Sequence, residues 1–268
     1  MAGYADDLSL AHLLADTADA ISMARFRALD LHVESKPDLT PVSDADTAVE
    51  KALRATLART RPRDAVLGEE FGASQAAAGP GTRQWVIDPI DGTKNFVRGV
   101  PVWATLIALQ EDEHTVLGLV SAPALGRRWY ATRGGGAWTR PAYSDDHPGT
   151  PCHVSKVGSV SDAFLSYASL DGWAASGRDE AFARLMTQVW RTRAFGDFWS
   201  YMLVAEGAVD VACEPEVSLW DLAALNVIVE EAGGRFTDLD GVDRVDGGSA
   251  IATNGLLHDQ VLDTLNRP

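Results

Sequence analysis

The stretch WVIDPIDGTKNF, from Trp85 to Phe96, ends an apolar run with two aspartates, Asp88 and Asp91. A carboxylate that directly follows a buried strand is costly to desolvate unless a cation pairs with it. Mg²⁺ prefers carboxylate oxygens and leaves coordination positions for phosphate and water. Because the two acids flank a proline, they cannot easily bind one ion side by side. This favours two ions about 3.5–4 Å apart, with Asp88 bridging them. The alternative for Asp88 is a turn that begins at Asp88-Pro89.

The residues that follow the two acids suggest a place for phosphate. If a helix begins at Gly92-Thr93, its free N–H groups form an anion site, and glycine lets a phosphate approach the backbone closely. Acids for metal beside donors for phosphate are the arrangement of a metal-dependent phosphoryl-transfer site. Lys94 is either a solvated first-turn lysine or a positive charge close to the phosphate or the acids.

Other acidic residues also stand where a strand is expected to end or a helix to begin. Taken singly, each has an ordinary explanation: carboxylates in a first turn accept free N–H groups and suit the helix dipole, and acids after a strand can form a solvated turn. Taken together, strand ends and helix starts in α/β folds commonly converge on one cleft. These residues are Glu69 and Glu70 at the end of the strand expected at 65–70, Asp44 and Asp46 after the helix-capping Ser43, and Asp221 at the start of a helix that stops at Gly233-Gly234.

The composition is that of a globular protein, with 46% hydrophobic residues in a chain of 268. That length allows one large domain or two smaller ones. The formal net charge of -15 disfavours nucleic acid and anionic membranes as partners, since both bind through Lys and Arg patches. An anionic substrate would need bound metal ions to overcome the same field.

The two cysteines, Cys152 and Cys213, stand far apart and outside a C-x-x-C pair, which is typical of reduced thiols in a cytosolic protein. The first residues lack the basic and apolar segments of a secretory signal. No apolar run reaches the roughly 18–20 residues of a membrane span. We therefore expect a soluble, cytoplasmic protein.

Helical and strand patterns alternate along the chain. The apolar segments 102–109 and 116–122 are expected to pair as a hairpin, and helical spacing is found near 6–29, 43–57, 178–190, 197–206, 221–232 and 256–265. This alternation predicts a layered α/β (α+β) fold with mixed sheets. The polar segment Thr139–Thr150 is the expected boundary between domains of residues 1–145 and 146–268.

Three stretches carry a resemblance to a known family: GEE (Gly68–Glu70), WVIDPIDGTKNF, and LWDLAALNVIVEEAGG (Leu219–Gly234). In this order and separation they resemble the inositol monophosphatase superfamily of Mg²⁺-dependent phosphatases, over nearly the whole chain. The resemblance implies an αβαβα sandwich, a homodimer, a small phosphate monoester as substrate, and two or three Mg²⁺ ions per active site. It also implies that the first domain carries most metal ligands and that the second carries Asp221 and the specificity residues.

The resemblance implies a role for each matching residue. Thr93, paired with Asp46, would help to deprotonate a metal-activated water that attacks phosphorus in line. Lys36 would lie near the metal-site acids, and Asp44 would contribute through water to a third, weaker metal near Glu69. The implied ligands are Glu69, Asp88 and the Ile90 carbonyl for the first metal, Asp88, Asp91 and Asp221 for the second, and Gly92 and Thr93 for phosphate. The aspartyl-phosphate phosphatases are a rival class, but they need D-x-D after an early strand, whereas this chain has D-x-x-D.

Within the superfamily, DGTKNFVRGVPVWATLIAL (Asp91–Leu109) and RAFGDFWSYMLVAEGAVD (Arg193–Asp210) resemble the bacterial histidinol-phosphatase branch. Histidinol phosphate carries an ammonium and an imidazole, so its site should offer carboxylates beyond those used by metal. Asp197 and Glu214 are the candidates, although Asp197 could instead be an N-cap. The alternatives are an inositol-1-phosphate phosphatase, a related sugar or nucleotide phosphatase, and a non-catalytic binding protein, which would not need a Thr93–Asp46 pair.

Overall fold

The computed structural model describes residues 3–37, 39–74, 81–112, 114–144 and 148–267. The domain boundary expected between residues 145 and 146 lies outside the described residues, and the division into two domains stays a prediction. The segment Thr150–Pro151, which follows that boundary, still pairs with a strand of the first half of the chain.

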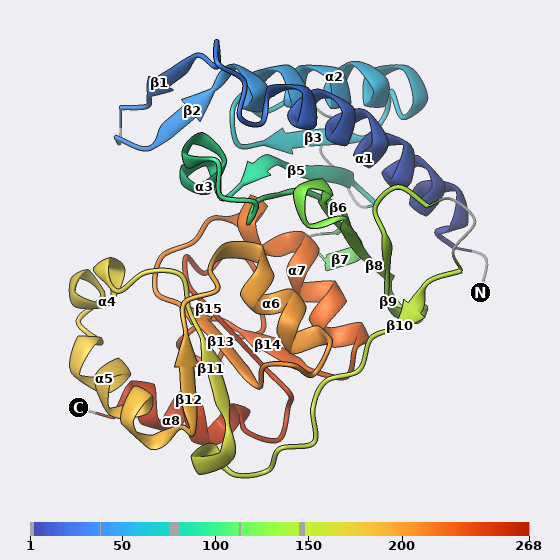
Figure 1. Cartoon of the computed structure of the whole chain (residues 1–268). Helices are drawn as coiled ribbons and strands as arrows, with labels where there is room; N and C mark the ends of the chain where they lie inside the picture. The colour runs from blue at the N-terminus through green and yellow to red at the C-terminus, as the bar shows by residue number, and fades with distance from the viewer. Residues whose placement is uncertain (1–2, 38, 75–80, 113, 145–147, 268) are drawn as a thin grey trace.

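A large mixed sheet forms the centre of the first half (Figure 1). Its order is β10-β9-β8-β7-β6-β5-β3-β4, with β3 parallel to β5 and the other pairs antiparallel. The hairpin expected from segments 102–109 and 116–122 is confirmed as β6 and β7. The strands are β3 (Ala65–Gly68), β4 (Gly72–Ala73), β5 (Arg83–Asp91), β6 (Ala104–Glu111), β7 (His114–Ala122), β8 (Arg127–Thr132), β9 (Gly136–Pro141) and β10 (Thr150–Pro151).

A smaller mixed sheet forms the second half. Its order is β12-β11-β13-β15-β14, and β11 runs parallel to both of its neighbours. The other pairs are antiparallel, so both sheets have the mixed character that the sequence predicts. The strands are β11 (Phe164–Ser166), β12 (Arg191–Arg193), β13 (Val211–Glu214), β14 (Arg235–Thr237) and β15 (Ala250–Thr253).

Helices cover both faces of both sheets and complete the expected αβαβα sandwich (Figure 1). One pair packs on the outer face of the large sheet, a second pair fills the space between the sheets, and a third group covers the outer face of the small sheet. These groups are α1 (Ala5–Arg25) with α2 (Asp44–Thr60), α6 (Asp197–Ala205) with α7 (Leu219–Glu231), and α4 (Asp171–Ala175) with α5 (Asp179–Gln188) and α8 (His258–Asn266).

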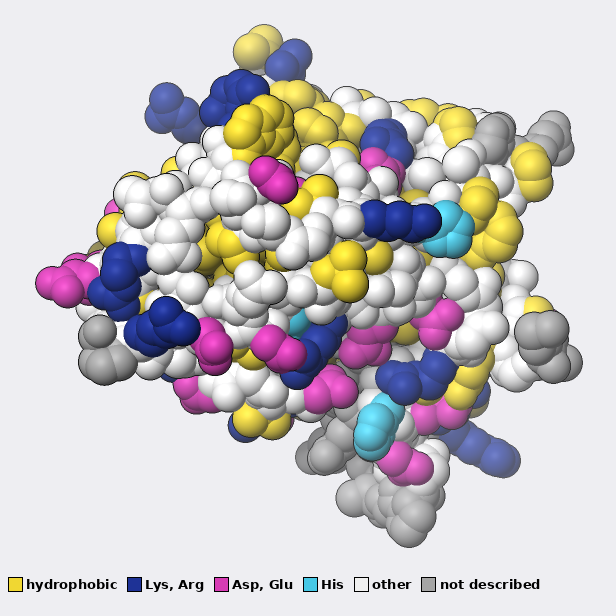
Figure 2. All heavy atoms as spheres, turned by 90° about the horizontal axis from the view of Figure 1, so that it is seen from below, with side chains coloured by type: hydrophobic (Ala, Val, Ile, Leu, Met, Phe, Trp, Pro, Cys, Tyr) yellow, Lys and Arg dark blue, Asp and Glu magenta, His cyan; other side chains and the backbone are white. Residues whose placement is uncertain are grey.

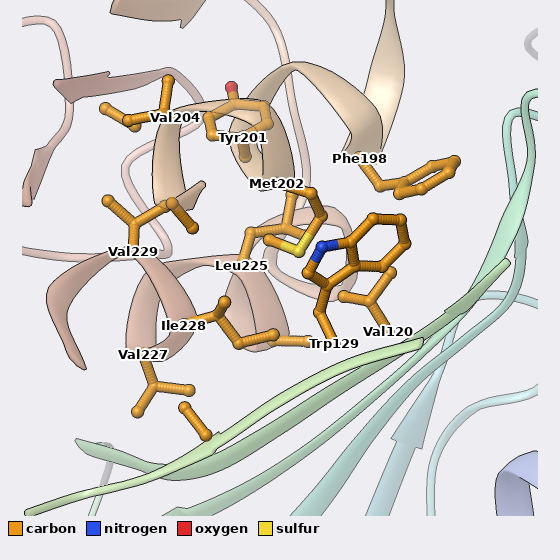
Figure 3. Close-up of a cluster of buried hydrophobic side chains, with 14 of the residues drawn as sticks. Val120, Trp129, Phe198, Tyr201, Met202, Val204, Leu225, Val227, Ile228 and Val229 are labelled. Carbon is orange, nitrogen blue, oxygen red and sulfur yellow. The ribbon is translucent and has the colours of Figure 1, made fainter. Parts of the chain in front are cut away.

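The layer between the sheets is a closely packed apolar core. Trp129 of the large sheet lies against Phe198 and Met202 of α6 (Figure 3), and the Trp129 and Phe198 rings are 6.2 Å apart. Burying aromatic side chains of this size gives each about 1.5–3 kcal/mol of stabilisation. This packing holds α6 and α7 against the large sheet and so fixes where their N-termini lie.

Short elements complete the chain. The first helix ends at Arg25 instead of continuing toward residue 29, because Phe26 takes an extended backbone and its ring packs against Phe96 and Trp103. Helix α4 was not expected from the sequence. The remaining elements are the hairpin β1 (Val33–Ser35) and β2 (Pro41–Ser43), the helix α3 (Thr93–Arg98), and the 3₁₀ turns η1 (Pro123–Leu125) and η2 (Val160–Asp162).

The surface carries both signs of charge. On the face shown in Figure 2, acidic and basic side chains are interspersed among uncharged and apolar ones. Among the described residues, no helix is both long and apolar enough to cross a membrane.

Candidate active site

A bulge at the end of β5 brings Asp88 and Asp91 to one side of the sheet. Asp88 pairs with Leu106 of β6 and Asp91 pairs with Ala104, so β5 advances three residues while β6 advances two. In a regular strand, residues three apart point to opposite faces. The extra residue of the bulge corrects this, and the two carboxylates can then face the same space.

Asp88, Asp91 and Asp221 form the acidic cluster of the site. One oxygen from each of the three carboxylates lies within 4.8 Å of the others. Asp221 comes from the first turn of α7, whose N-terminus is fixed by the apolar core described above. The sequence-based expectation that a strand end and a helix start converge here is met by this geometry.

Backbone N–H groups hold one oxygen of each carboxylate in place. These bonds leave the second oxygen of each side chain directed to other partners, and they fix the carboxylates before any ligand arrives. Asp46 and Asp221 each bind the N–H of the residue that precedes their own helix, so they cap a helix and line the site at once. The bonds are Ile90 N–H to Asp88 Oδ1 (2.9 Å), Phe198 N–H to Asp91 Oδ2 (2.7 Å), Ser218 N–H to Asp221 Oδ2 (2.7 Å) and Ser43 N–H to Asp46 Oδ2 (2.8 Å).

The cluster is held at an electrostatic cost. Burial, followed by the charges of Glu69, Asp91 and Asp221, raises the pKa of Asp88 well above its usual range. Burial raises the pKa of Asp221 to about 7, against the Ser218 N–H, which lowers it. Burial and the charges of Asp197 and Asp221 raise the pKa of Asp91. Buried carboxylates that repel one another are a set of hard oxygen donors suited to a divalent cation.

Glu69 lies beside this cluster and is paired with a lysine. Lys36 donates to Glu69 Oε1 at 2.6 Å and to Glu70 Oε1 at 2.9 Å. This agrees with the expectation that Lys36 lies near the acids of the site. Burial alone would lower the pKa of Lys36, but its hydrogen bonds to Glu69 and Glu70 raise it. The ammonium therefore binds one oxygen, Oε1, of the carboxylate that the resemblance assigns to the first metal.

Glu50 fixes the turn that carries Glu69, and sequence reasoning missed it. Its fully buried carboxylate accepts the N–H groups of Glu70 (2.8 Å) and Phe71 (3.2 Å). A Cβ at position 68 would lie 2.1 Å from Glu50 Oε1, so Gly68 leaves room for it. A glutamate inside a helix gives no sequence signal of such a role, because its partners are some twenty residues away.

Thr93 and Asp46 are in contact. Thr93 Oγ1 lies 3.2 Å from Asp46 Oδ1 and 2.9 Å from the Ile90 carbonyl oxygen. A hydroxyl has one proton, so it donates to one of these acceptors at a time. Burial raises the pKa of Asp46, while its bonds from Ser43 act in the opposite direction.

Asp197 and Glu214 lie close enough to the cluster for their charges to raise the pKa of Asp91 beyond the effect of burial. Asp197 Oδ2 accepts a hydrogen bond from Asn95 Nδ2 at 3.0 Å. Glu214 Oε2 lies 3.4 Å from the Tyr201 hydroxyl, and its Oε1 is buried without a hydrogen-bond partner among the described residues. Burial, then the charges of Asp197 and Asp221, raises the pKa of Glu214.

The interpretation of Asp197 as an N-cap is wrong. The N-cap of α6 is Gly196, and Asp197 is the first helical residue with a φ of 49°. Within the described part of the chain, helix α6 has no hydrogen bond to a capping side chain, and the N–H of Phe198 in its first turn binds Asp91 instead. The Asp197 carboxylate is thereby left for another role.

Two further candidates are placed apart from the cluster or at its edge. The Asp44 carboxylate is bound by Arg25 at 2.7 Å, which gives no support to a role in metal binding. Lys94 is exposed on α3, and its charge lowers the pKa of Asp197 against the larger effect of burial. Lys94 is thus close enough to Asp197 for its charge to act on that carboxylate.

The fold and this arrangement of acids agree with a known family. A model of the inositol monophosphatase family matches residues 6–267. The chain belongs to the inositol monophosphatase family. Membership makes it a phosphatase, and its acidic cluster could bind a metal ion.

Relatives within the inositol monophosphatase family cover the whole chain. It is 59% identical to a histidinol-phosphatase of Streptomyces coelicolor, over 100% of this chain and 99% of the relative. It is 60% identical to a histidinol-phosphatase of Mycobacterium tuberculosis, over 97% of this chain and 98% of that protein. The solved structure of an inositol monophosphatase from Zymomonas mobilis matches 100% of both chains with a TM-score of 0.84 and 32% identity.

For this family member, Gly92→Ala is expected to lower phosphatase activity at least tenfold. Gly92 has a φ of 82°, and a Cβ there would lie 3.0 Å from the Val102 carbonyl oxygen and 3.2 Å from Asp197 Oδ2. The left-handed backbone alone costs an alanine about 1–2 kcal/mol. The matched control is Gly99→Ala at the other end of α3, where φ is 73° and the added Cβ meets the Arg27 side chain. Steady-state kinetics and thermal unfolding of both variants check this, and equal activity losses in the two would contradict a local role for Gly92.

Proposed function

We propose that this phosphatase hydrolyses L-histidinol phosphate to L-histidinol and phosphate, a step of histidine biosynthesis, with Mg²⁺ as its metal. The high identity to two histidinol-phosphatases supports the substrate. The observation that carries the proposal is Glu214 Oε1, which is buried and has no hydrogen-bond partner among the described residues, close enough to Asp197 for the charge of Asp197 to raise the pKa of Glu214. A neutral polyol offers no charge to match it, whereas a cationic substrate does.

The site contains more carboxylates than the proposed metal ions need, and this supports a cationic substrate. After Asp88, Asp91 and Asp221 are assigned to metal, Asp197 and Glu214 are left as further carboxylates whose pKa is raised by burial. A buried carboxylate without a partner costs several kcal/mol, and an ammonium or imidazolium removes that cost. In the proposal, these two side chains bind the ammonium and imidazole of histidinol phosphate.

The metal ligands proposed are the residues assigned from the sequence. Glu69, Asp88 and the Ile90 carbonyl would hold one Mg²⁺, and Asp88, Asp91 and Asp221 a second. The donor set fits, since it consists of carboxylate and carbonyl oxygens with one oxygen of each aspartate fixed by a backbone N–H. When bound, the ions would activate water and neutralise the charge that develops on the phosphate and the leaving oxygen.

The chain's own residues would manage the proton and the phosphate. Thr93 Oγ1 would accept a proton from water while it passes its own to Asp46 Oδ1, 3.2 Å away. A raised pKa suits Asp46 to hold that proton. The N–H groups of Gly92 and Thr93 precede the first hydrogen bonds of α3, which run from Asn95 and Phe96 to Gly92, and would bind phosphate oxygens.

The location and oligomeric state proposed for the enzyme follow the sequence-based expectations. We infer a cytoplasmic homodimer, supported by the composition and the family resemblance. Lys36 binds Glu69 Oε1 at 2.6 Å, so the first Mg²⁺ and a third one near Glu69 would each bind Oε2 or displace the ammonium from Oε1. Light scattering of the purified protein tests the dimer.

A substrate panel tests the function. Phosphate release with Mg²⁺ is measured for histidinol phosphate, inositol 1-phosphate, fructose 1,6-bisphosphate and a nucleotide 3′,5′-bisphosphate. We expect the highest kcat/KM for histidinol phosphate. The alternative is an inositol-1-phosphate phosphatase, which the likeness to the Zymomonas mobilis structure supports. A higher kcat/KM for inositol 1-phosphate would select that alternative.

Asp197→Asn is expected to raise KM for histidinol phosphate about tenfold or more, with a smaller effect on an ester without an amine. Asparagine tolerates the left-handed backbone at this position as aspartate does, so the substitution removes mainly the charge. A hydrogen bond to a charged group contributes about 1.5–3 kcal/mol, or about 10–100-fold in affinity. The control is Asp179→Asn, an exposed first-turn residue of α5. Equal KM changes for both esters would point to a structural effect instead.

A further inference from the structure

Asn95 connects the phosphate-handling end of the site to the carboxylate that faces the rest of the substrate. It lies on α3, one turn after Gly92, and its Nδ2 donates to Asp197 Oδ2 at 3.0 Å and to the Val102 carbonyl at 2.9 Å. We propose that Asn95 is a positioning residue that orients Asp197 and thereby sets the preference for phosphate esters bearing an ammonium. This inference rests on the proposed function, which assigns Asp197 to the substrate.

Asp197 has few other means of holding its direction. Its backbone is left-handed, with a φ of 49° after Gly196 at 86°, so the regular helix geometry does not fix its side chain. The nearby Phe198 N–H donates its hydrogen bond to Asp91 and not to Asp197. After burial, the charge of Asp197 raises the pKa of Asp91 and also that of Glu214, so two carboxylates of like charge lie near it. An unanchored Asp197 would turn away from these neighbours toward solvent.

Asn95 is itself held rigidly enough to act as the anchor. An asparagine amide nitrogen has two N–H donors, and here each has one acceptor. Its backbone N–H binds the Gly92 carbonyl at 2.9 Å, and its carbonyl accepts the Val100 N–H at 2.9 Å. Hydrogen bonds thus fix the side-chain amide, the backbone N–H and the backbone carbonyl of Asn95. The direction of Asp197 Oδ2 is therefore tied to the position of α3.

The arrangement leaves the other oxygen of Asp197 for a ligand. Asn95 occupies Oδ2, so Oδ1 is the atom that would meet the ammonium. The same short segment, Asp91–Asn95, therefore makes two links to α6: Asp91 to the Phe198 N–H and Asn95 to the Asp197 carboxylate. The distance between the phosphate end and the cation end of a bound ester is set by these two links.

The test compares two esters that differ only in the amine. These are histidinol phosphate and its deamino analogue, 3-(imidazol-4-yl)propyl phosphate. In Asn95→Ala and in the nearly isosteric Asn95→Asp, KM for histidinol phosphate should rise about tenfold more than KM for the analogue. Arg98→Ala, an exposed residue of the same helix, is the matched control and should keep the wild-type ratio. Thermal unfolding shows which variants are folded.

A double-mutant cycle separates positioning from a general structural effect. Because Asn95 acts through Asp197, adding Asn95→Ala to Asp197→Asn should change the KM ratio no further. Independent, additive effects on the ratio would overturn the inference, as would folded Asn95 variants that keep the wild-type ratio while Asp197→Asn loses it. If the wild-type enzyme does not distinguish the two esters, ammonium recognition fails and both this inference and that part of the proposed function fall.

Discussion

Asp88→Asn is expected to reduce kcat/KM by a factor on the order of 10³ or more while the protein stays folded. Asp88 is 1% exposed, and it is the residue assigned to bridge both metal ions. Removing a group that positions and neutralises charge at the reacting centre typically costs about 10²–10³ in rate, and a bridging ligand affects two ions. Asparagine Oδ1 can still accept the Ile90 N–H, so the local backbone should be retained.

The control for Asp88→Asn is a buried aspartate outside the site. Asp7 is 5% exposed and binds Arg61 at 2.8 Å and Arg83 at 2.6 Å. Asp7→Asn should lower the melting temperature and keep kcat. Asp88→Asn should raise the melting temperature of the metal-free protein, because it removes one of several repelling charges. In the presence of metal, it should lower kcat. Mn²⁺ titration by calorimetry should show weakened binding, and wild-type turnover by Asp88→Asn would exclude the assigned site.

The stability of the metal-free protein is expected to fall as pH rises from about 4 to above 7. Asp88, Asp91 and Asp221 have folded-state pKa values above their unfolded values, with Asp221 at about 7. The folded state therefore binds more protons than the unfolded state, and the stabilisation present at low pH is lost as pH rises through the folded pKa values. We expect a fall in Tm of at least about 5 °C, where 1 kcal/mol corresponds to roughly 2–4 °C.

Saturating Mg²⁺ should remove most of this pH dependence above neutrality, because the ion replaces the lost protons and binds the folded state. Differential scanning calorimetry between pH 4 and 9, with EDTA or with Mg²⁺, measures both effects. Asp88→Asn should show a shallower slope in EDTA. A metal-free protein that gains stability toward pH 8 would contradict the raised pKa values of the cluster.

Local patterns in the sequence predict those parts of the site that depend on nearby residues. Ser43 caps α2 as expected, whereas Asp88 and Asp91 share one space only because of a bulge that the D-x-x-D spacing does not show. Capping a helix does not prevent Asp46 or Asp221 from lying in the candidate site. Asp46 binds the Ser43 N–H with Oδ2 and contacts Thr93 with Oδ1, and Asp221 binds the Ser218 N–H while it lies in the cluster with Asp88 and Asp91.

Contacts between distant residues are what the sequence does not predict. Asn95 meets Asp197 across 102 positions, and the N–H of Phe198 meets Asp91 across 107. No local period or motif encodes such pairs, because they arise only when α6 is packed against the large sheet. The ion pair of Asp44 with Arg25 is a similar case, where a tertiary partner decides between two reasonable interpretations of a first-turn acid.

The link between Asp91 and α6 has a consequence for how this enzyme can change its substrate. Its donor is a peptide N–H, which every amino acid except proline would supply at position 198. Any substitution at position 198 other than proline therefore keeps this hydrogen bond, while the buried Phe198 and Met202 side chains are still needed to pack α6 against the large sheet. A change of substrate that needs a different residue at position 198 would thus keep α6 tied to Asp91, whereas one that disturbs the apolar packing would not.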